Sequence, residues 1–456
     1  MAPKFGTSGL RGLVVELTPA LVGDHVRAFL AACPVGTGLW VGRDLRASSP
    51  AIAELVMQAA SGAGVRVIDC GEVPTPALAL AAMNAGASAV MVTGSHIPAD
   101  RNGLKFYVPT GEISKSDEQA ILGALGSNDP GLSGARHSDQ ATGIAYVSRY
   151  ADAFGGDALA GMTIGVYTHS TVGRDLLIQI LQRLGAAVVE LGRSETFIPV
   201  DTEAVSPEMQ ALLTGWAADH TLDAIVSLDG DGDRPLLADA EGKIVPGDVL
   251  GQITGAALGA AVAVTPVSSN TGAERVYDRV IRTRIGSPFV IAGMEAEGGD
   301  VVGYEANGGF LLGFQSQGSA GVLSPLMTRD AVLPLVVPLM QAKELGVAAM
   351  VAAQPARFTA TGRVENVPTE VSLAFVAKLE TDLTARATFL ASMDGTEAQV
   401  DTTDGLRMTL TDGRVVHLRP SGNAPECRFY AEAETEEAAK AALAQGLTVL
   451  ANALRD

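Results

Sequence analysis

Two kinds of hydrophobic run alternate along the first part of the chain. Short β-branched runs predict strands, and longer stretches with apolar residues three or four positions apart predict helices. Thr18-Pro19, Ser49-Pro50 and Thr75-Pro76 carry a hydroxyl residue followed by proline, which is typical of a helix N-terminus. In this first cycle we expect helices over 18–30, from 49 and over 75–86, and strands over 39–41, 65–68 and from 90. Alternation at this spacing predicts a mainly parallel sheet covered by helices on both faces.

Two more cycles follow, after a stretch rich in Gly, Ser and Asp that predicts a surface loop over 127–139. The pattern of the second cycle predicts strands over 164–167, 188–191 and 224–228 and helices over 171–184 and 207–218. The pattern of the third predicts strands over 262–267, 289–291 and 301–304 and helices over 274–281 and 333–345. The similar size of the cycles suggests internal duplication, although no strict repeat is visible at residue level.

From about Pro368 the pattern changes. A helix expected over 370–387 precedes strand-like runs over 398–402, 406–410 and 414–418, and a helix over 436–450 follows them. Asp404-Gly405 and Asp412-Gly413 separate the runs, and Asp-Gly is a strong hairpin signal. This region predicts an antiparallel sheet with helices.

The predicted fold class is therefore α/β: three similar domains with mixed or parallel sheets around a central cleft, plus a C-terminal α+β domain with an antiparallel sheet. The expected domain bounds are 1–145, 146–252, 253–365 and 366–456.

Composition narrows the class of protein. Of 456 residues, 47% are hydrophobic and 18% charged, which is typical of a folded chain. The net charge of −19 disfavours a nucleic-acid partner, and an anionic ligand must be held by local cations and backbone amides. Three widely spaced cysteines, no apolar N-terminal signal and no apolar run of membrane-spanning length predict a cytoplasmic protein with no membrane partner.

Thr93-Gly94-Ser95-His96 ends the apolar run that begins at Val90. This places the Ser95 hydroxyl on a loop at the carboxyl end of a strand, where open α/β sheets bind ligands. His96 and Lys105 put two ionisable groups, each a potential cation, near that hydroxyl, and a nucleophilic serine needs a base or a strong local field. An ordinary polar turn is the alternative.

The strongest local signal is an acidic loop with Asp229, Asp231 and Asp233 directly after a predicted strand. Three carboxylates in one short loop repel each other unless a cation neutralises them, and hard oxygen ligands favour Mg²⁺ or Ca²⁺. An EF-hand is excluded, because Arg234 and Ala240 stand where that motif needs glycine and glutamate. The alternative is a solvated acidic turn.

Three further loops carry groups that bind anions or hydroxyls. The segment 5–12 combines close glycines with Arg11, and the turn 303–310 offers Glu305 and Asn307. Arg419 and Arg428 bracket a Ser-Gly-Asn turn that suits a dianionic phosphate. A flexible N-terminal arm, a hairpin turn and a surface Pro/Gly turn are the respective alternatives.

Taken together, these motifs resemble the α-D-phosphohexomutase superfamily, particularly its phosphomannomutase/phosphoglucomutase branch, over the whole chain. The resemblance implies a phosphoserine at Ser95 and one Mg²⁺ held by Ser95, Asp229, Asp231 and Asp233. It implies that catalysis involves Ser95, Lys105 as a proton-transfer group, Arg11 and His96. The implied substrate-binding residues are Glu305, Asn307, Arg419, Ser421, Gly422, Asn423, Arg428 and Arg234.

The implied activity is interconversion of hexose 6-phosphate and hexose 1-phosphate, of mannose and/or glucose, through a bisphosphate intermediate. A hexose bisphosphate is the implied activator, and the implied assembly is a monomer or homodimer. A phosphoglucosamine mutase, a sugar-phosphate-binding protein that has lost turnover, and a phosphatase are the alternatives.

The sequence departs from the family pattern at three loops. Ile97 stands where the family usually has asparagine, and Asn423-Ala424 stand where it has Thr-Glu. In the sugar loop, Asn307 replaces serine and Gly309 replaces histidine. Because that histidine is a candidate acid/base, Lys105 or a residue from elsewhere must cover its role in an active enzyme.

Overall fold

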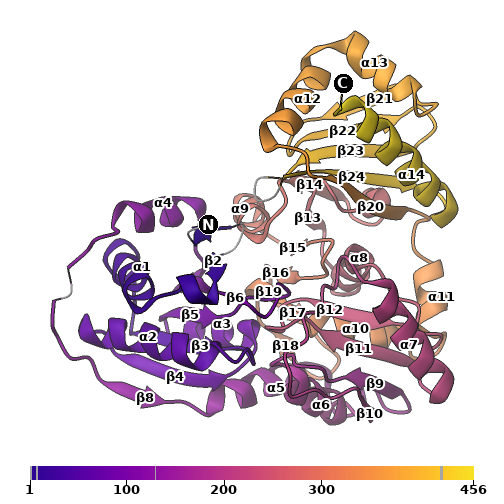
Figure 1. The fold of residues 1–456 in the computed structure, drawn as a ribbon. Coiled ribbons are helices and arrows are strands. Elements are labelled where there is room, and N and C mark those ends of the chain that lie inside the picture. The colour runs from indigo at the N-terminus through magenta and orange to yellow at the C-terminus, as the bar shows by residue number, and fades with distance from the viewer. Residues whose placement is uncertain (1–2, 7–8, 129, 422–424, 456) are drawn as a thin grey trace. The chain divides into compact units, whose positions relative to one another are not determined.

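A computed structural model describes residues 3–6, 9–128, 130–421 and 425–455. The chain forms two compact units. Unit 1 consists of residues 1–261 and 286–353, and unit 2 of residues 262–285 and 354–456. The chain therefore passes from one unit to the other within the third α/β cycle, so the units do not follow the cycles (Figure 1).

The first sheet of unit 1 is mixed. Strands β5, β3, β4 and β8 lie side by side in this order and are parallel. On the other side of β5, the strands β6, β2 and β1 follow, and each is antiparallel to its neighbour. The strands are β1 (Lys4–Phe5), β2 (Leu10–Leu13), β3 (Leu39–Arg43), β4 (Val67–Glu72), β5 (Ser88–Val92), β6 (Arg101–Val108), β7 (Gly111–Glu112) and β8 (Arg136–Ser138).

Helices cover both faces of this sheet, as predicted (Figure 1). Val90 and Val92 of β5 pack with one cluster of helices, and Ala89 and Met91, which point the other way, pack with another. The first cluster contains α1 (Pro19–Ala32), α2 (Ser49–Gly62) and α4 (Lys115–Gly123), and the second contains α3 (Thr75–Asn84). Thr18 caps α1 by accepting a hydrogen bond from the Leu21 amide.

The expectation of loop throughout 127–139 is wrong at β8 (Arg136–Ser138). All three side chains of β8 are exposed, so no hydrophobic pattern marks it, and its strand structure comes from backbone pairing with β4 at the sheet edge.

The second sheet has the order β10-β9-β11-β12. The strands β9 (Thr163–Tyr167), β10 (Ala187–Leu191) and β11 (Ala224–Leu228) are parallel, and β12 (Pro235–Ala238) returns antiparallel to β11. Leu228 pairs with Pro235, so residues 229–234 form the tight connection between two buried strands. The flanking helices are α5 (Ala141–Phe154), α6 (Arg174–Arg183), α7 (Pro207–Asp219) and α8 (Gly247–Ala257).

The last elements of unit 1 are antiparallel strands and three helices. Strands β15 (Val301–Tyr304), β16 (Phe310–Leu312) and β19 (Leu326–Asp330) pair in that order, and β17 (Ser316–Gln317) and β18 (Val322–Leu323) form a separate hairpin. The expected strand over 289–291 is wrong, because it lies in α9 (Ser287–Glu297). A short apolar run fits a buried helix as well as a strand, and Ser287-Pro288 is the start signal that decides for the helix. The other helices are α10 (Leu333–Ala342) and α11 (Val347–Ala352).

Unit 2 contains the parallel pair β13 (Val262–Pro266) and β14 (Arg279–Thr283). The helix expected over 274–281 is wrong, because that range covers the end of a 3₁₀ turn, Thr271–Arg275, and the start of β14. Asn270 caps the start of this turn by accepting from the Gly272 amide, and the turn ends at Arg275, before β14 begins.

The C-terminal part of unit 2 is an antiparallel sheet in the order β20-β24-β23-β22-β21, which confirms the predicted α+β region. The single helix expected over 370–387 is interrupted at Asp382, whose side chain caps a new helix. The elements are β20 (Phe358–Glu365), α12 (Thr369–Thr381), α13 (Leu383–Ala391), β21 (Glu397–Asp401), β22 (Leu406–Leu410), β23 (Val415–Pro420), β24 (Glu426–Ala433) and α14 (Glu436–Ala453).

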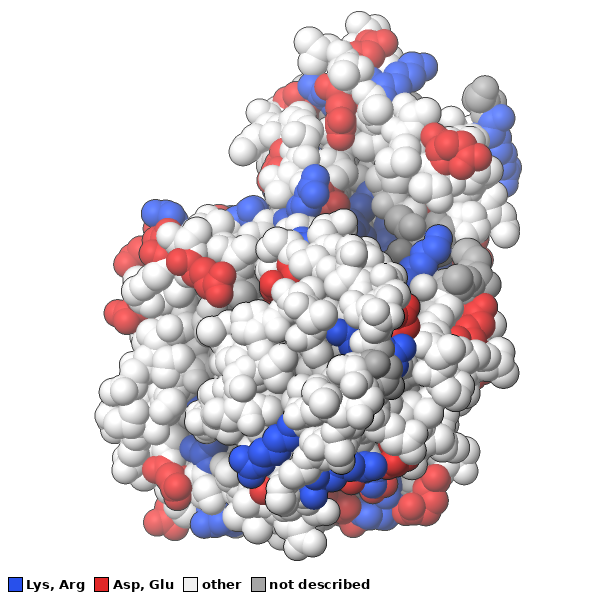
Figure 2. Space-filling view, turned by 90° about the vertical axis from the view of Figure 1, so that its left-hand side faces the viewer, with Lys and Arg blue, Asp and Glu red and all other residues white. Residues whose placement is uncertain are grey.

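On the face in Figure 2, Lys and Arg side chains occur in several places and lie beside Asp and Glu side chains. A search of the described helices finds none whose length and hydropathy suit a membrane crossing.

Candidate active site

The Ser95 loop follows β5 and holds its serine in an uncommon backbone conformation. Ser95 has a φ of 52°, in the left-handed region that non-glycine residues rarely adopt. Its amide donates to Thr93 Oγ1 at 2.7 Å, and its Oγ donates to Asp229 Oδ2 at 2.7 Å. Such a backbone costs roughly 1–3 kcal/mol and persists only where the surroundings enforce it, which is common at functional sites.

Arg46 enforces this conformation, and the sequence analysis missed it. Its Nη2 donates to the carbonyls of Ser95 at 2.8 Å and Ile97 at 2.6 Å, and its Nη1 donates to those of Pro98 and Arg101. One guanidinium thus binds four carbonyls of the loop.

Asp44 in turn fixes Arg46. It accepts from Arg46 Nε at 3.2 Å, from Thr93 Oγ1 at 2.7 Å and from Ser49 Oγ, and it is buried with Arg46. A Cβ on Gly94 would lie 2.6 Å from Arg46 Cζ, so the loop needs glycine there for space. The available signal was the charged stretch Arg43-Asp44-Leu45-Arg46 at the carboxyl end of β3.

The three aspartates of the β11–β12 turn are fully buried, and their ligand oxygens lie within 4.8 Å of one another. Asp231 Oδ1 and Asp233 Oδ1 find no hydrogen-bond donor in the part of the chain that the structure describes. Buried carboxylate oxygens are costly unless they are paired or bind a cation. Hard, converging oxygens of this kind fit a divalent ion such as Mg²⁺.

Lys105 of β6 joins this turn. Its Nζ donates to Asp231 Oδ2 at 2.5 Å and to Asp233 Oδ2 at 2.6 Å, and Thr75 Oγ1 also donates to Asp231. The structure therefore brings Ser95, Lys105 and the three aspartates into one buried cluster.

Arginines complete the cluster. Arg329 of β19 lies 2.8 Å from Asp233 Oδ2, and Arg234 Nη1 lies 3.1 Å from His96 Nδ1. Arg11 stands opposite Gly103 in the β2–β6 pairing. Burial, followed by the Arg234 charge, lowers the pKa of Arg11 to about 10, which places Arg11 in the field of the same cluster.

The cluster also shifts the pKa values of its other groups. Burial raises the pKa of Asp229, and the neighbouring charges of Asp231 and Asp233 raise it further. Burial works against ionisation of Asp231 as well, yet the Lys105 ammonium lowers the pKa of Asp231 below its usual range. Burial and the Arg234 cation lower the pKa of His96 to about 3, so its imidazole is neutral near pH 7.

Glu305 and Asn307 lie in the β15–β16 turn, and both are buried. Glu305 Oε2 is 3.5 Å from Arg329 Nη1, which connects the turn to the aspartate cluster. Asn307 Oδ1 accepts from the Gly309 amide at 3.0 Å, and the Asn307 carbonyl accepts from Thr202 Oγ1 at 2.9 Å.

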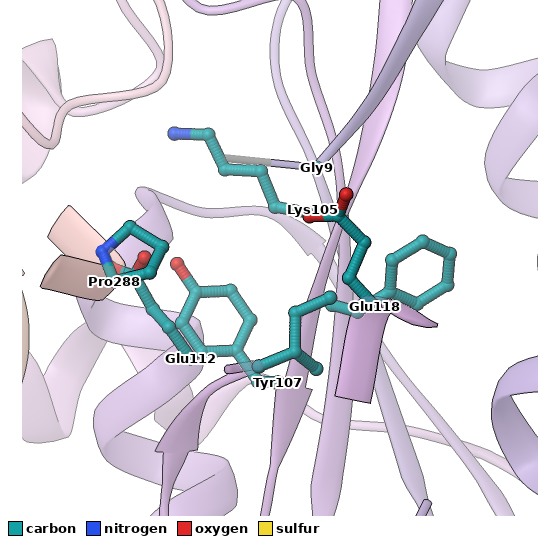
Figure 3. Close-up of a pocket in the computed structure, with 8 residues that line it drawn as sticks. Gly9, Lys105, Tyr107, Glu112, Glu118 and Pro288 are labelled. Carbon is teal, nitrogen blue, oxygen red and sulfur yellow. The ribbon is translucent and has the colours of Figure 1, made fainter. Parts of the chain in front are cut away.

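A small pocket lies beside Lys105. Gly9, Lys105, Tyr107, Glu112, Glu118 and Pro288 line it, and the Lys105 side chain extends away from the Glu118 carboxylate (Figure 3). Glu112 accepts hydrogen bonds from Ser287 at 2.7 Å and Thr328 at 2.9 Å. The pocket therefore has its own carboxylates, distinct from those that bind Lys105 Nζ.

The predicted phosphate loop lies in unit 2, between β23 and β24. Arg419 and Arg428 face each other across the two strands, and each is hydrogen bonded to one carboxylate at 2.9 Å, Asp404 and Glu426 respectively. Ser421 is buried, and its amide donates to the Glu426 carbonyl. Gly422 and Asn423 lie outside the described residues.

Family models cover nearly the whole chain in the order of its domains. The phosphoglucomutase/phosphomannomutase α/β/α domains I, II and III match residues 2–130, 145–242 and 247–357, and the C-terminal domain of the same family matches residues 369–447. The chain belongs to the phosphoglucomutase/phosphomannomutase family. As a member of that family it is a phosphohexomutase, an intramolecular phosphotransferase.

Individual relatives agree with this family. A phosphomannomutase of Sinorhizobium fredii is 46% identical and covers 99% of each chain, and a phosphomannomutase of Salmonella muenchen is 41% identical and covers 95% of this chain and 92% of the relative. A phosphoglucosamine mutase of Symbiobacterium thermophilum is 30% identical over 64% of this chain and 71% of its own.

Solved structures share the fold. A phosphoglucomutase/phosphomannomutase family protein of Burkholderia thailandensis has a TM-score of 0.79 at 22% identity, over 98% of this chain and 96% of its own. An N-acetylphosphoglucosamine mutase of Aspergillus fumigatus, in complex with GlcNAc-6P and magnesium, has a TM-score of 0.61 at 13% identity, over 99% of this chain and 96% of its own.

Proposed function

We propose that this phosphohexomutase interconverts mannose 6-phosphate and mannose 1-phosphate, with glucose phosphates as further substrates, by way of a phosphoserine at Ser95. The observation that carries the proposal is the 2.7 Å hydrogen bond from Ser95 Oγ to Asp229 Oδ2 inside the buried aspartate cluster. A serine in this position can hold a phosphoryl group beside a divalent ion.

We propose that one Mg²⁺ is held by Asp229, Asp231 and Asp233 together with the Ser95 group. The two buried oxygens without hydrogen-bond donors support this assignment. When bound, the ion supplies charge neutralisation during phosphoryl transfer.

A phosphoserine and a divalent ion would also compensate each other within this buried cluster, where Lys105 and Arg329 already form ion pairs with Asp231, Asp233 and Glu305. A phosphoserine carries about two negative charges, and a divalent ion offsets them, so neither needs to be buried without compensation.

Each transfer moves one phosphoryl group between Ser95 and a sugar hydroxyl. The hydroxyl oxygen of a hexose monophosphate forms a bond to phosphorus as the bond to Ser95 Oγ breaks. The hydroxyl gives up its proton, and the departing Ser95 Oγ takes up one to become a hydroxyl again. The product is a hexose bisphosphate, which reorients so that Ser95 Oγ takes its other phosphoryl group. Added hexose bisphosphate therefore activates any enzyme molecule that has lost its phosphoryl group.

We assign the transfer of protons to and from the reacting oxygens to Lys105, whose Nζ is buried within the cluster. Arg11 and His96 complete the proposed catalytic group. Glu305 and Asn307 are proposed to accept hydrogen bonds from the sugar hydroxyls, because both offer acceptor oxygens at one turn.

The phosphate that is not reacting is proposed to bind Arg419, Ser421 and Arg428, together with Gly422 and Asn423. One such site serves both orientations of the intermediate, because either phosphate can occupy it. Arg234 is proposed to contact a phosphate that lies between it and the metal. The proposed domains are 1–145 for the phosphoserine loop, 146–252 for the metal loop, 253–365 for the sugar loop and 366–456 for the phosphate loop.

The identity of the sugar is supported by the relatives. The two phosphomannomutases are 46% and 41% identical, against 30% for the phosphoglucosamine mutase, which remains the second candidate. Mannose, glucose and glucosamine 6-phosphates assayed side by side test the order. We expect the highest kcat/KM for the mannose compound, and a clear preference for the amino sugar would reverse our assignment.

The central experiment compares wild type with Ser95→Ala in conversion of mannose 1-phosphate with a trace of hexose bisphosphate. We expect conversion only with wild type, together with a phosphoryl mass on Ser95 that exchanges with substrate. Tight sugar-phosphate binding without exchange would indicate a binding protein, and steady release of inorganic phosphate would indicate a phosphatase.

A further inference from the structure

Arg329 lies between the two loops that we assign to the metal and the sugar. Its Nη2 is 2.8 Å from Asp233 Oδ2, and its Nη1 is 3.5 Å from Glu305 Oε2. The three side chains are almost completely buried. One guanidinium in a water-poor environment thus contacts a carboxylate of each loop.

The contact with Asp233 determines which oxygen faces an ion. Lys105 Nζ donates to the same Oδ2 at 2.6 Å, so two cations hold that atom. Asp233 Oδ1 has no hydrogen-bond donor among the residues that the structure describes, and Arg234 Nε lies 3.8 Å from it, beyond hydrogen-bond distance. Arg329 and Lys105 therefore orient the carboxylate with Oδ1 available for a cation, which is how the partners of metal ligands set ligand geometry.

Gly309 provides the space for Arg329. The β16–β19 pairing places Phe310 opposite Asp330, so Arg329 lies beside the end of the sugar-loop turn. A Cβ on Gly309 would lie 2.7 Å from Arg329 Cδ and 2.9 Å from Cγ. Gly308 has a positive φ of 87°, whereas Gly309 is not among the glycines with positive φ. The requirement for glycine at 309 is therefore steric, and it comes from the Arg329 side chain.

We propose that Arg329 is a positioning residue that couples metal binding at Asp233 to sugar-phosphate binding at Glu305. An ion that attracts Asp233 changes how strongly that carboxylate holds the guanidinium, and hence how Glu305 is held. Because coupling between two binding equilibria is reciprocal, sugar phosphate changes the affinity for Mg²⁺ by the same factor by which Mg²⁺ changes the affinity for sugar phosphate. The inference rests on the proposed function, since it takes the two loops as metal and sugar sites.

The test measures binding in Ser95→Ala, where turnover is absent. Calorimetry gives the Kd of mannose 1-phosphate with and without Mg²⁺, and the ratio of the two values is the coupling factor. With Arg329 present we expect a factor of about 5 or more, the lower end for coupled sites. In Arg329→Met we expect a smaller factor, and in Arg329→Lys an intermediate one. An unchanged factor in Arg329→Met would overturn the proposal.

Metal affinity provides a second readout that needs no substrate. Titration with Mn²⁺, followed by electron paramagnetic resonance, should show weakening of roughly 10–100-fold in Arg329→Met, the range found when partners of metal ligands are removed. An affinity equal to that of the parent would contradict the orienting role.

Gly309→Ala tests the role of Arg329 by steric displacement and leaves the charge of Arg329 in place. Alone, it should displace Arg329 and lower both the coupling factor and the Mn²⁺ affinity. In an Arg329→Ala background, which lacks the Cγ and Cδ atoms that a Cβ on residue 309 would meet, it should change them by less than twofold. Additive effects in the double variant would show that Gly309 acts independently of Arg329.

Two matched controls in unit 2 separate this role from general destabilisation. Gly362→Ala places a Cβ 2.7 Å from Leu447 Cδ1, and Arg386→Met removes a buried arginine that is paired with Glu397. Both should lower the Tm and leave the coupling factor unchanged. If wild type shows no conversion, the proposed function fails; if it converts while Arg329→Met keeps its coupling factor, only this inference fails.

Discussion

Two charged turns, one in each unit, show opposite ways of holding charge. The β11–β12 turn carries Asp229, Asp231 and Asp233 with no exposed surface, and their contacts come from β5, β6 and β19. At the β23–β24 turn, the side chains of Arg419 and Arg428 are 21% and 41% exposed, and each is hydrogen bonded to a single carboxylate of its own sheet region.

This difference indicates whether the charges of each turn contribute mainly to stability or to ligand binding. Buried charges are expensive to leave unpaired, so the first turn is tied to the stability of unit 1 and suits groups that stay bound through a catalytic cycle. Partly exposed arginines contribute little to stability and can leave their carboxylates for a ligand. The second turn therefore suits a phosphate that must be released.

The largest effect is expected at Ser95. Ser95→Ala should lower kcat on the order of 10⁴-fold or more, as is found when nucleophiles are removed. The Tm should fall modestly, because Asp229 Oδ2 loses the hydrogen bond that the Ser95 hydroxyl donates. Measuring both separates the chemical from the structural role of the cluster. Retention of a tenth or more of wild-type activity would contradict a phosphoserine mechanism.

A large stability effect is expected at Arg46. Arg46→Met leaves Asp44 buried without its partner and removes the donor to four carbonyls of the Ser95 loop. Because a buried charge without a partner is costly, we expect a loss of about 3–5 kcal/mol in the free energy of unfolding. Urea unfolding measures it. The control is Arg419→Met, at a partly exposed ion pair, which should cost less than about 1 kcal/mol. Equal losses would remove the distinction between the turns.

His417 makes the stability of unit 2 depend on pH. Burial lowers its pKa to about 4, with the Arg407 cation acting in the same direction and the Asp404 carbonyl and carboxylate opposing it. Arg419 and the stacked Tyr430 also face the ring. The unfolded chain, with a histidine pKa near 6.5, takes up the proton first, so stability is full above about pH 6.5 and falls as the pH drops towards 4.

The expected loss between pH 7 and pH 4 is up to about 3 kcal/mol, from a shift of roughly two and a half pKa units. His417→Phe keeps the stacked ring and removes the titration, so its unfolding free energy should fall less over this range. The measurement is urea unfolding of both proteins at several pH values. If the unfolding free energies of the two proteins changed equally with pH, His417 would not be the group that titrates.

The smallest effect on the fold is expected at Arg428. Arg428→Ala should raise the KM for mannose 1-phosphate about 10-fold or more, since a hydrogen bond from a charged group contributes roughly 1.5–3 kcal/mol. Its unfolding free energy should change by less than about 1 kcal/mol. Lys440→Ala, an exposed lysine on α14 that is paired with Glu436, is the matched control and should leave KM unchanged. A raised KM in the control would mean that charge in this region matters more than position.

The sequence by itself determined the features that depend on neighbouring residues. The alternation of strands and helices, the Asp-Gly hairpins of unit 2 and the acidic turn after β11 follow from local spacing, and the structure contains all of them. Local spacing gave the wrong element where a short apolar run fits either a helix or a strand. The strand expected over 289–291 lies in α9, and the helix expected through 281 runs into β14.

Only the tertiary structure decided which charged side chains meet. Ser95 and Asp229 are 134 residues apart, and Lys105 and Asp233 are 128 apart, so nothing in their neighbourhoods specifies the partner. Arg46 and Arg329 carry no motif, and their roles come from burial beside particular carbonyls and carboxylates. The reason is physical: local pattern sets backbone conformation, whereas the pairing of buried charges depends on which sheet edges and loops pack together.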